Sequence, residues 1–291
     1  MTTAREILDY LATQGHEFDF ANEEQADPAQ CPVETVEVDD TAGRGALAWS
    51  RRQGAVHSFC GTLLLCTEAA VGEPPPVDTS KPARLCTPNA GAVVAVCPRP
   101  RLALAEAVWR FFPHLTEDVP GRFHDKALEE QAGDLGAWVR NAFLSQHVRL
   151  GPHVSIGCAG MGYERRDDGT LVGFPQLGKV MVEPDVDIAA HATIQRGALG
   201  ETRICRGAKI GPHVNVGHNV HIGPDVLIAG HAQIGGGATI GARAVLWQSC
   251  AVANGVTVGE GAVVGMGAQV RHDVPAGETW VGNPARPLHK G

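Results

Sequence analysis

The segment Ile204–Val270 reads ICRGAKIGPHVNVGHNVHIGPDVLIAGHAQIGGGATIGARAVLWQSCAVANGVTVGEGAVVGMGAQV, and an aliphatic residue returns in it at every sixth position. An α-helix repeats its apolar positions every three to four residues and a strand every two, so neither element alone gives this period. Short strands joined by turns give it, and glycine often stands where the chain must turn. Three such sides close a coil of about 18 residues, which predicts a mainly β fold, a left-handed parallel β-helix. The aliphatic positions are Ile204, Ile210, Val216, Ile222, Ile228, Ile234, Ile240, Leu246, Val252, Val258, Val264 and Val270.

The same spacing continues upstream with two interruptions. Leu150 and Ile156 are six residues apart, and Val182 begins a further run that ends at Ile194. The longer step from Ile194 to Ile204 predicts a short loop within residues 197–203. A larger excursion spans roughly residues 158–179, and its RRDDGT sequence is typical of an exposed turn. We expect about six coils between residues 146 and 275.

The remainder of the chain has a different pattern, which predicts a second kind of domain. Residues 1–118 combine helical segments at 3–14 and 102–112 with β-rich runs at 35–38, 62–67 and 91–96, as in a small α/β domain. Residues 119–145 form a linker segment with helical composition. The β-helix domain is then residues 146–280, and residues 281–291 form a C-terminal tail.

Composition excludes several classes of function. The chain has 24 Lys and Arg against 32 Asp and Glu, a formal charge of −8, so we expect no nucleic-acid partner. No apolar run approaches the roughly 18 residues of a membrane span, and the start lacks a signal pattern, which predicts a cytoplasmic protein. The eight cysteines include no CxxC pair, so we expect free thiols rather than a disulfide framework or a metal site.

Three motifs in a fixed order resemble one enzyme family. They are GCAGMGYERRDDGTLVGFPQLGKV at 157–180, TIQRGALGETRI at 193–204 and VNVGHNV at 214–220. In the first domain VETVEVDDTAGRGALAWS at 33–50, GTLLLCTEA at 61–69 and AGAVVAVCPRPRLALAEAVWRFF at 90–112 add to the likeness. Together they resemble the UDP-3-O-acylglucosamine N-acyltransferases of the lipid A pathway over almost the whole chain. The resemblance implies a homotrimer with active sites between neighbouring β-helices, an N-terminal nucleotide-binding domain, a nucleotide-linked amino sugar as acceptor and an acyl thioester as donor.

His218 matches the catalytic histidine of that family. It follows Val216 by two positions, at a turn where its side chain should point outward, and the positions one coil away are Gly200 and Gly236. A neutral imidazole is suited to take the proton that a sugar amine loses when it attacks a thioester. No cysteine lies in a matched motif, so we expect direct transfer without an acyl-enzyme. Glu201 is a candidate for the carboxylate that orients the imidazole.

Three departures from the family pattern shift the expected substrate. Gly211 stands where the family has an aspartate, Asn254 and Gly255 stand near the place of a second histidine, and the C-terminal helices that bind acyl carrier protein are missing from this sequence. These differences favour the related enzymes that acylate UDP- or dTDP-linked deoxyamino sugars for surface polysaccharides with an acyl-CoA co-substrate. We expect no other cofactor. The lipid A reaction with acyl carrier protein remains the alternative.

Five further residues are candidates for binding. Trp49 matches the family aromatic that stacks on uracil, with core packing as the alternative, and Arg51 beside it suits the diphosphate. Asn219 could orient the sugar or cap a turn. The backbone N–H groups around Gly230 could stabilise an oxyanion, and Met266 could line an acyl channel or fill the core.

A zinc enzyme is the rival from another class. His191, His213 and His231 occupy the same position in their hexads and should form a ladder. His213 and His218 make an H-x4-H pair, a spacing like that of the trimeric γ-class carbonic anhydrases, in which imidazoles bind zinc. That fold needs no nucleotide-binding domain, so we predict a transferase without a metal site.

Overall fold

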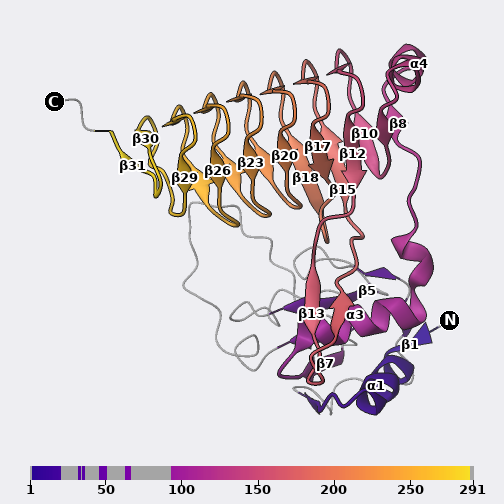
Figure 1. Cartoon of the computed structure of the whole chain (residues 1–291). Coiled ribbons are helices and arrows are strands. Elements are labelled where there is room, and N and C mark those ends of the chain that lie inside the picture. Colours follow the sequence, from indigo (N-terminus) through magenta and orange to yellow (C-terminus); the bar gives the residue numbers. More distant parts are fainter. Residues whose placement is uncertain are drawn as a thin grey trace, which may run out of the picture. The chain divides into compact units, whose positions relative to one another are not determined.

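The computed structural model describes residues 2–20, 32–33, 35–36, 46–50, 63–66 and 93–288 of the chain, which forms two compact units. The first unit comprises Met1–Glu117 together with Met161–Pro175. The second comprises Asp118–Gly160 together with Gln176–Gly291 and contains the repeats (Figure 1). A segment that interrupts the repeats in sequence therefore folds with the N-terminal part of the chain.

The second unit confirms the left-handed parallel β-helix predicted from the six-residue period. All neighbouring strands of its three sheets are parallel except β30 and β31 at the end. The first sheet contains β8 (Arg122–Phe123), β10 (Ala142–Leu144), β15 (Lys179–Val182), β18 (Glu201–Ile204), β21 (His221–Ile222), β24 (Thr239–Ile240) and β27 (Thr257–Val258). The second contains β11 (Arg149–Leu150), β16 (Asp187–Ile188), β19 (Lys209–Ile210), β22 (Leu227–Ile228), β25 (Val245–Leu246), β28 (Val263–Val264), β30 (Thr279–Val281) and β31 (Arg286–Pro287). The third contains β9 (Trp138–Val139), β12 (Ser155–Cys158), β17 (Thr193–Gln195), β20 (Asn215–Val216), β23 (Gln233–Ile234), β26 (Ala251–Val252) and β29 (Gln269–Val270).

The predicted aliphatic positions fill the interior of these coils. Ile222 pairs with Ile240 one coil further on, and both side chains are fully buried. The residue before each of them points the other way, as the two-residue alternation of a strand requires. Small residues such as Ala232 and Ala238 are also buried, at positions two residues before the next aliphatic one. Each coil thus adds its layer to one continuous apolar core.

Both interruptions lie at the same corner of the coil. The excursion between β12 and β15 and the loop at 196–200 between β17 and β18 each follow a strand of the third sheet and precede one of the first. We call this corner the insertion corner. The turns between the second and third sheets form the histidine corner, named for His153, His191, His213 and His231. Insertions are tolerated at corners because they leave the buried ladder in register.

The segment 119–145 differs from the expected linker. It contains α4 (Lys126–Asp134), and its strands β8, β9 and β10 pair with the first and third sheets. Leu128 and Ala132 of α4 and Leu144 of β10 are buried with the β-helix core. The helical composition belongs to one short helix that covers the first coil, so the segment is part of the second unit.

The first unit is the expected α/β arrangement. Its sheet has the order β2 (Asp19–Phe20), β7 (Val93–Val96), β6 (Leu63–Cys66), β5 (Ala46–Ser50) and β4 (Thr35–Val36), with only the β2–β7 pair antiparallel. β1 (Thr2–Thr3) pairs with β3 (Pro32–Val33). Among the described residues its helices are α1 (Ala4–Thr13), which a capping box starts at Thr3 and Glu6, and α3 (Pro100–Phe111), followed by the 3-10 helix η3 (Pro113–Thr116). The hairpin of β13 (Tyr163–Arg165) and β14 (Leu171–Gly173) completes the unit. No helix within the described ranges is long and apolar enough to cross a membrane.

The buried ladder should carry the stability of the β-helix. Replacing Ile240 by Ala should lower the free energy of unfolding by about 2 to 5 kcal/mol, because the side chain is fully buried and its loss leaves a cavity. Thr239→Ala in the same strand is the matched control, since Thr239 is exposed, and it should cost less than about 1 kcal/mol. Urea denaturation measures both values. Equal losses would contradict this assignment of inside and outside.

Candidate active site

The turn between β20 and β21 holds His218 and Asn219 at the insertion corner. Asn219 has a φ of 58°, a left-handed conformation that asparagine adopts more readily than most residues. Its N–H donates to Thr202 Oγ1 at 2.8 Å. Its side-chain Oδ1 accepts from the Ala198 N–H at 2.9 Å, and its Nδ2 donates to the Leu199 carbonyl at 2.6 Å. Both ends of the amide are therefore used to hold the 196–200 loop, which fixes the orientation of the amide.

This amide in turn fixes the protonation of His218. Its Nδ1 lies 3.1 Å from Asn219 Oδ1. Because that oxygen is an acceptor, we assign the proton to Nδ1, which leaves the lone pair on Nε2. Within the described part of the chain Nε2 makes no hydrogen bond, and the ring is half-buried. The structure thus presents one basic nitrogen in a defined direction.

The expected carboxylate partner of His218 is replaced by this amide. Glu201 does not face the imidazole: its Oε1 accepts from Arg203 at 2.8 Å from Nε and 2.7 Å from Nη2. Arg203 also donates to Glu183 at 2.8 Å. A guanidinium beside Glu201 is a stronger partner than an imidazole, which explains why Glu201 turns away. Asn219 therefore positions the ring instead, through a neutral hydrogen bond.

Two glycines leave the imidazole uncovered. A Cβ on Gly236, one coil further on, would lie 2.6 Å from Nε2, so any larger residue there would obstruct this atom. On the other side the expected residue was Gly200, and the structure places Gly160 there. A Cβ on Gly160 would lie 3.1 Å from His218 Cδ2. The correction arises because the excursion and the 196–200 loop both break the 18-residue register below His218, and Gly200 packs against Gly178 instead.

Arg196 is a residue of this corner that the sequence did not single out. It is almost fully buried, and its Nε donates to the Gly178 carbonyl at 2.7 Å. Its Nη1 lies 3.7 Å from Asp118 Oδ1. Burial lowers the pKa of the guanidinium, and the charge of Asp118 opposes that shift. Arg196 therefore ties the end of the excursion to the loop. Its position inside the QRGALGE motif was the feature of the sequence that could have identified it.

The other predicted binding residues lie elsewhere. Trp49 lies in β5 of the first unit, and its side chain and Arg51 are outside the described residues. Gly230 lies at the histidine corner between β22 and β23, and so does Met266, which is 72% exposed, between β28 and β29. The Ala229 N–H donates to Leu246 at 2.8 Å. Of the neighbouring residues Ala229 and Gly230, only Gly230 has an N–H that makes no hydrogen bond within the described residues. Within one chain these groups are at a different corner from His218.

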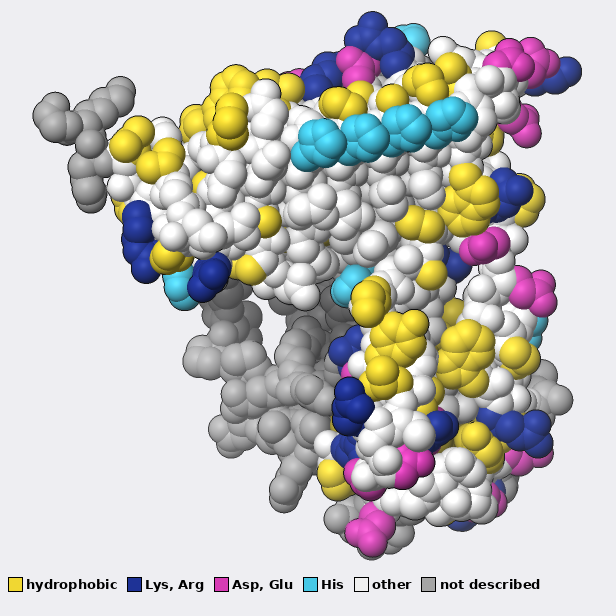
Figure 2. All heavy atoms as spheres, in the orientation of Figure 1, with side chains coloured by type: hydrophobic (Ala, Val, Ile, Leu, Met, Phe, Trp, Pro, Cys, Tyr) yellow, Lys and Arg dark blue, Asp and Glu magenta, His cyan; other side chains and the backbone are white. Residues whose placement is uncertain are grey.

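The histidine ladder is present and longer than predicted. The ring centroids of neighbouring residues lie 5.3, 4.9 and 4.9 Å apart, and the rings are stacked. His153, three residues after Leu150, is the additional rung; Figure 2 shows the four in a row. His213 belongs to this ladder, whereas His218 lies at the insertion corner. Among the described residues no group of three or more His, Cys, Asp or Glu side chains is placed to hold a metal ion.

The described cysteines do not supply a nucleophile to this corner. Cys158, Cys205, Cys97 and Cys250 are free thiols. Cys158 ends β12 at the start of the excursion, and burial raises the pKa of its thiol. Burial also raises the pKa of Cys250 to about 11. Since the thiolate is the nucleophilic form, these shifts favour the less nucleophilic protonated thiol.

The part of the repeats that contains His218 matches the model of a known family. Residues 201–236, which include His218, match the model of the bacterial transferase hexapeptide (six repeats). A segment of 61 residues is 44% identical to the UDP-3-O-acylglucosamine N-acyltransferase of Francisella tularensis subsp. holarctica (strain FTNF002-00 / FTA). That match covers 21% of this chain and 18% of the curated relative, so the chain matches under a fifth of the length of that relative.

Two solved structures show partial likeness. The UDP-N-acetylglucosamine O-acyltransferase of Moraxella catarrhalis RH4 has a TM-score of 0.46 and 22% identity, over 51% of this chain and 56% of that one. PerB of Caulobacter crescentus, solved with CoA and GDP-perosamine, has a TM-score of 0.29 and 19% identity, over 86% of this chain and 98% of that one.

The tautomer of His218 is directly testable. At mildly alkaline pH, ¹⁵N chemical shifts of the ring should show Nδ1 protonated and Nε2 unprotonated, because Asn219 Oδ1 accepts from Nδ1. Asn219→Gly keeps the left-handed backbone but removes the acceptor, so it should give a mixture of tautomers. Asn219→Asp keeps the acceptor and should preserve the Nδ1–H form. A wild-type ring protonated mainly on Nε2 would contradict the assignment.

Proposed function

We propose that this protein is an N-acyltransferase that moves an acyl group from a thioester to the amine of a nucleotide-linked amino sugar, with His218 as general base. The observation that carries the proposal is the single basic nitrogen, Nε2, which Asn219 directs and two glycines leave accessible. The hexapeptide match across residues 201–236 and the similarity to the UDP-3-O-acylglucosamine N-acyltransferases support this reaction class.

The reaction needs one proton to move twice. The sugar amine attacks the thioester carbonyl carbon while Nε2 of His218 takes a proton from the amine. The N–C bond forms, the carbonyl oxygen becomes an oxyanion, and the C–S bond then breaks. The departing thiolate takes the proton back from the imidazolium, which regenerates the neutral ring. No acyl-enzyme is formed, in keeping with the raised thiol pKa of Cys158 at this corner.

The rest of the site is completed by a neighbouring subunit in this proposal. Gly230 and Met266 lie at the histidine corner, so a homotrimer in which that corner of one chain meets the insertion corner of the next would bring them to His218. The Gly230 N–H then stabilises the oxyanion, and Met266 borders the acyl group. In the first unit Trp49 stacks on the base, and Arg51 binds the diphosphate. The Asn219 amide bonds to His218, Ala198 and Leu199, so in this proposal it orients the base rather than the sugar.

Loss of the imidazole should remove most of the activity. His218→Ala should lower the turnover of an acyl-CoA with UDP- or dTDP-linked amino sugars by about a hundredfold or more, because it removes the proposed general base. Thiol release in a colorimetric assay measures the rate. His147→Ala is the matched control, since it removes an exposed histidine at the corner between the first and second sheets, and it should keep near-normal turnover. Near-normal activity in His218→Ala would refute the proposal.

The donor distinguishes two versions of this function. A coenzyme A thioester of a short acyl group, used for surface polysaccharides, is favoured because the chain has a formal charge of −8 and would repel a strongly acidic carrier protein. The similarity to the lipid A enzymes favours a long acyl chain on carrier protein. A side-by-side assay of acetyl-CoA, 3-hydroxybutyryl-CoA and 3-hydroxymyristoyl carrier protein should show turnover with a CoA ester. Turnover with the carrier-bound chain alone would establish the lipid A reaction.

A further inference from the structure

The β13–β14 hairpin of the first unit has a gap in its outward face at Gly173. Gly173 pairs with Tyr163 on the neighbouring strand, so a side chain at either position would point to the same face. A Cβ built on Gly173 would lie 3.9 Å from Tyr163 Cε1 and 4.0 Å from Trp109 Cζ2. Both are ordinary contact distances between carbon atoms. A ligand atom at that point would therefore touch two aromatic rings at once.

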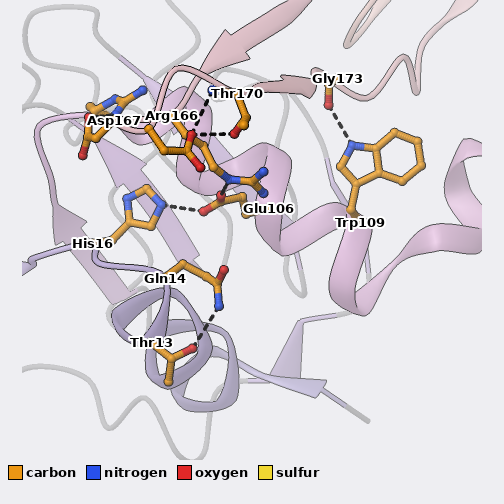
Figure 3. A network of polar contacts seen from close by, with 11 residues as sticks. Thr13, Gln14, His16, Glu106, Trp109, Arg166, Asp167, Thr170 and Gly173 are labelled. Carbon is orange, nitrogen blue, oxygen red and sulfur yellow. Dashed lines mark hydrogen bonds and ion pairs between the residues drawn. The ribbon is translucent and has the colours of Figure 1, made fainter.

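The two rings flank this glycine from opposite sides. The Phe174 N–H donates to the Gly162 carbonyl at 2.8 Å, which makes Tyr163 and Gly173 a non-hydrogen-bonded pair of the hairpin. The Gly173 carbonyl therefore points away from β13, and Trp109 Nε1 of α3 donates to it at 2.7 Å (Figure 3). Trp109 is 47% exposed and Tyr163 is 54% exposed. We call the space between the two rings, above Gly173, the aromatic slot.

Contacts within the first unit hold the walls of the slot in place. Glu106 of α3, whose side chain is only 3% exposed, accepts from Arg166 Nε of the hairpin at 2.8 Å (Figure 3). Arg101 of the same helix pairs with Glu164 at 3.1 Å. These bonds join the helix and the hairpin that carry the two rings. A site that is already formed loses less conformational entropy when a ligand binds.

A guanidinium lies on the same face of the hairpin as the slot. Arg165 is two residues along β13 from Tyr163, a step of roughly 7 Å in a strand. Its Nη1 donates to the Gly169 carbonyl at 2.7 Å, and within the described residues it makes no ion pair. Asp167 of the turn is paired with Arg99 at 2.7 Å instead. The remaining N–H groups of Arg165 are therefore available to a phosphate, which guanidinium groups bind well.

We propose that the aromatic slot binds the base of a nucleoside phosphate, with the phosphate directed toward Arg165. The inference goes beyond the proposed function, in which Trp49 stacks on the base of the acceptor, and does not rest on it. Every nucleobase has a flat face that stacks on aromatic rings, so the slot suits both the pyrimidine of a nucleotide sugar and the adenine of coenzyme A. A saturated sugar ring or an acyl chain has no such flat face to place between two rings.

A single methyl group tests the slot. In Gly173→Ala the new Cβ makes ordinary contacts with both rings, so the fold should survive while the methyl group occupies the place of the base. Calorimetric titration with UMP, dTMP and AMP should show binding that Gly173→Ala weakens by about tenfold or more. Gly133→Ala is the matched control, because a Cβ on this glycine of α4 would contact no described residue, and it should bind as the wild type does.

Two further measurements locate the ligand. The indole N–H signal of Trp109, identified by its loss in Trp109→Phe, should shift in NMR spectra when a nucleotide is added. Arg165→Ala should reduce the preference for UMP over uridine, because it removes the guanidinium that faces the phosphate. Preference for UMP and dTMP would identify the nucleotide sugar as the source of the base, and preference for AMP would identify coenzyme A; either supports the inference.

Three results would overturn the inference. One is wild-type nucleotide affinity in Gly173→Ala, which would place the nucleotide at another site such as Trp49. Another is ribose 5-phosphate binding as tightly as UMP, which would show that the base is not bound. The third is a shift of the Trp109 signal with methyl glucoside and not with nucleotides, which would assign the slot to a sugar. Binding is measured without acyl transfer, so the outcome is separate from that of His218→Ala.

Discussion

The structure depends on one constraint: each coil must bury an aliphatic side chain at every sixth position. Ile222 and Ile240 satisfy it in successive coils of the first sheet, and both are fully buried. Chemistry is therefore left to the side chains that leave the coil, at the corners and at the outward positions of the short strands. Each corner residue then meets the residue about one coil away, as His218 meets Gly236 and His213 meets His231. Packing of the core thereby decides the surroundings of the candidate base.

The two insertions build on this constraint without disturbing the core. Both leave the coil at the corner of His218, and they replace a regular turn by the 196–200 loop and by a hairpin that folds with α3. Asn219 joins them to the imidazole through Ala198 and Leu199. An amide fixes the tautomer as a carboxylate would, but it carries no charge to stabilise an imidazolium.

Much of this arrangement follows from the sequence. The period from Ile204 to Val270 predicts the β-helix, and it places Gly236 beside His218 and the histidines in a ladder. The 18-residue spacing does not predict the residue that contacts His218 from the preceding coil, because residues 158–179 and 196–200 interrupt the register. Gly160 therefore lies where Gly200 was expected. The spacing of residues in the sequence also does not predict which side chains form hydrogen bonds with one another. Glu201 binds Arg203 rather than His218, since side-chain conformations and competing charges decide that pairing.

The central claim is that His218 Nε2 receives the proton of a sugar amine. The most direct measurement is a crystal structure of the protein with a UDP- or dTDP-linked amino sugar, compared with the same sugar lacking the amine. The account predicts the base bound by the first unit and the amine nitrogen within about 3 Å of Nε2, either directly or through one water molecule. An amine bound at the histidine ladder or far from the insertion corner would contradict it.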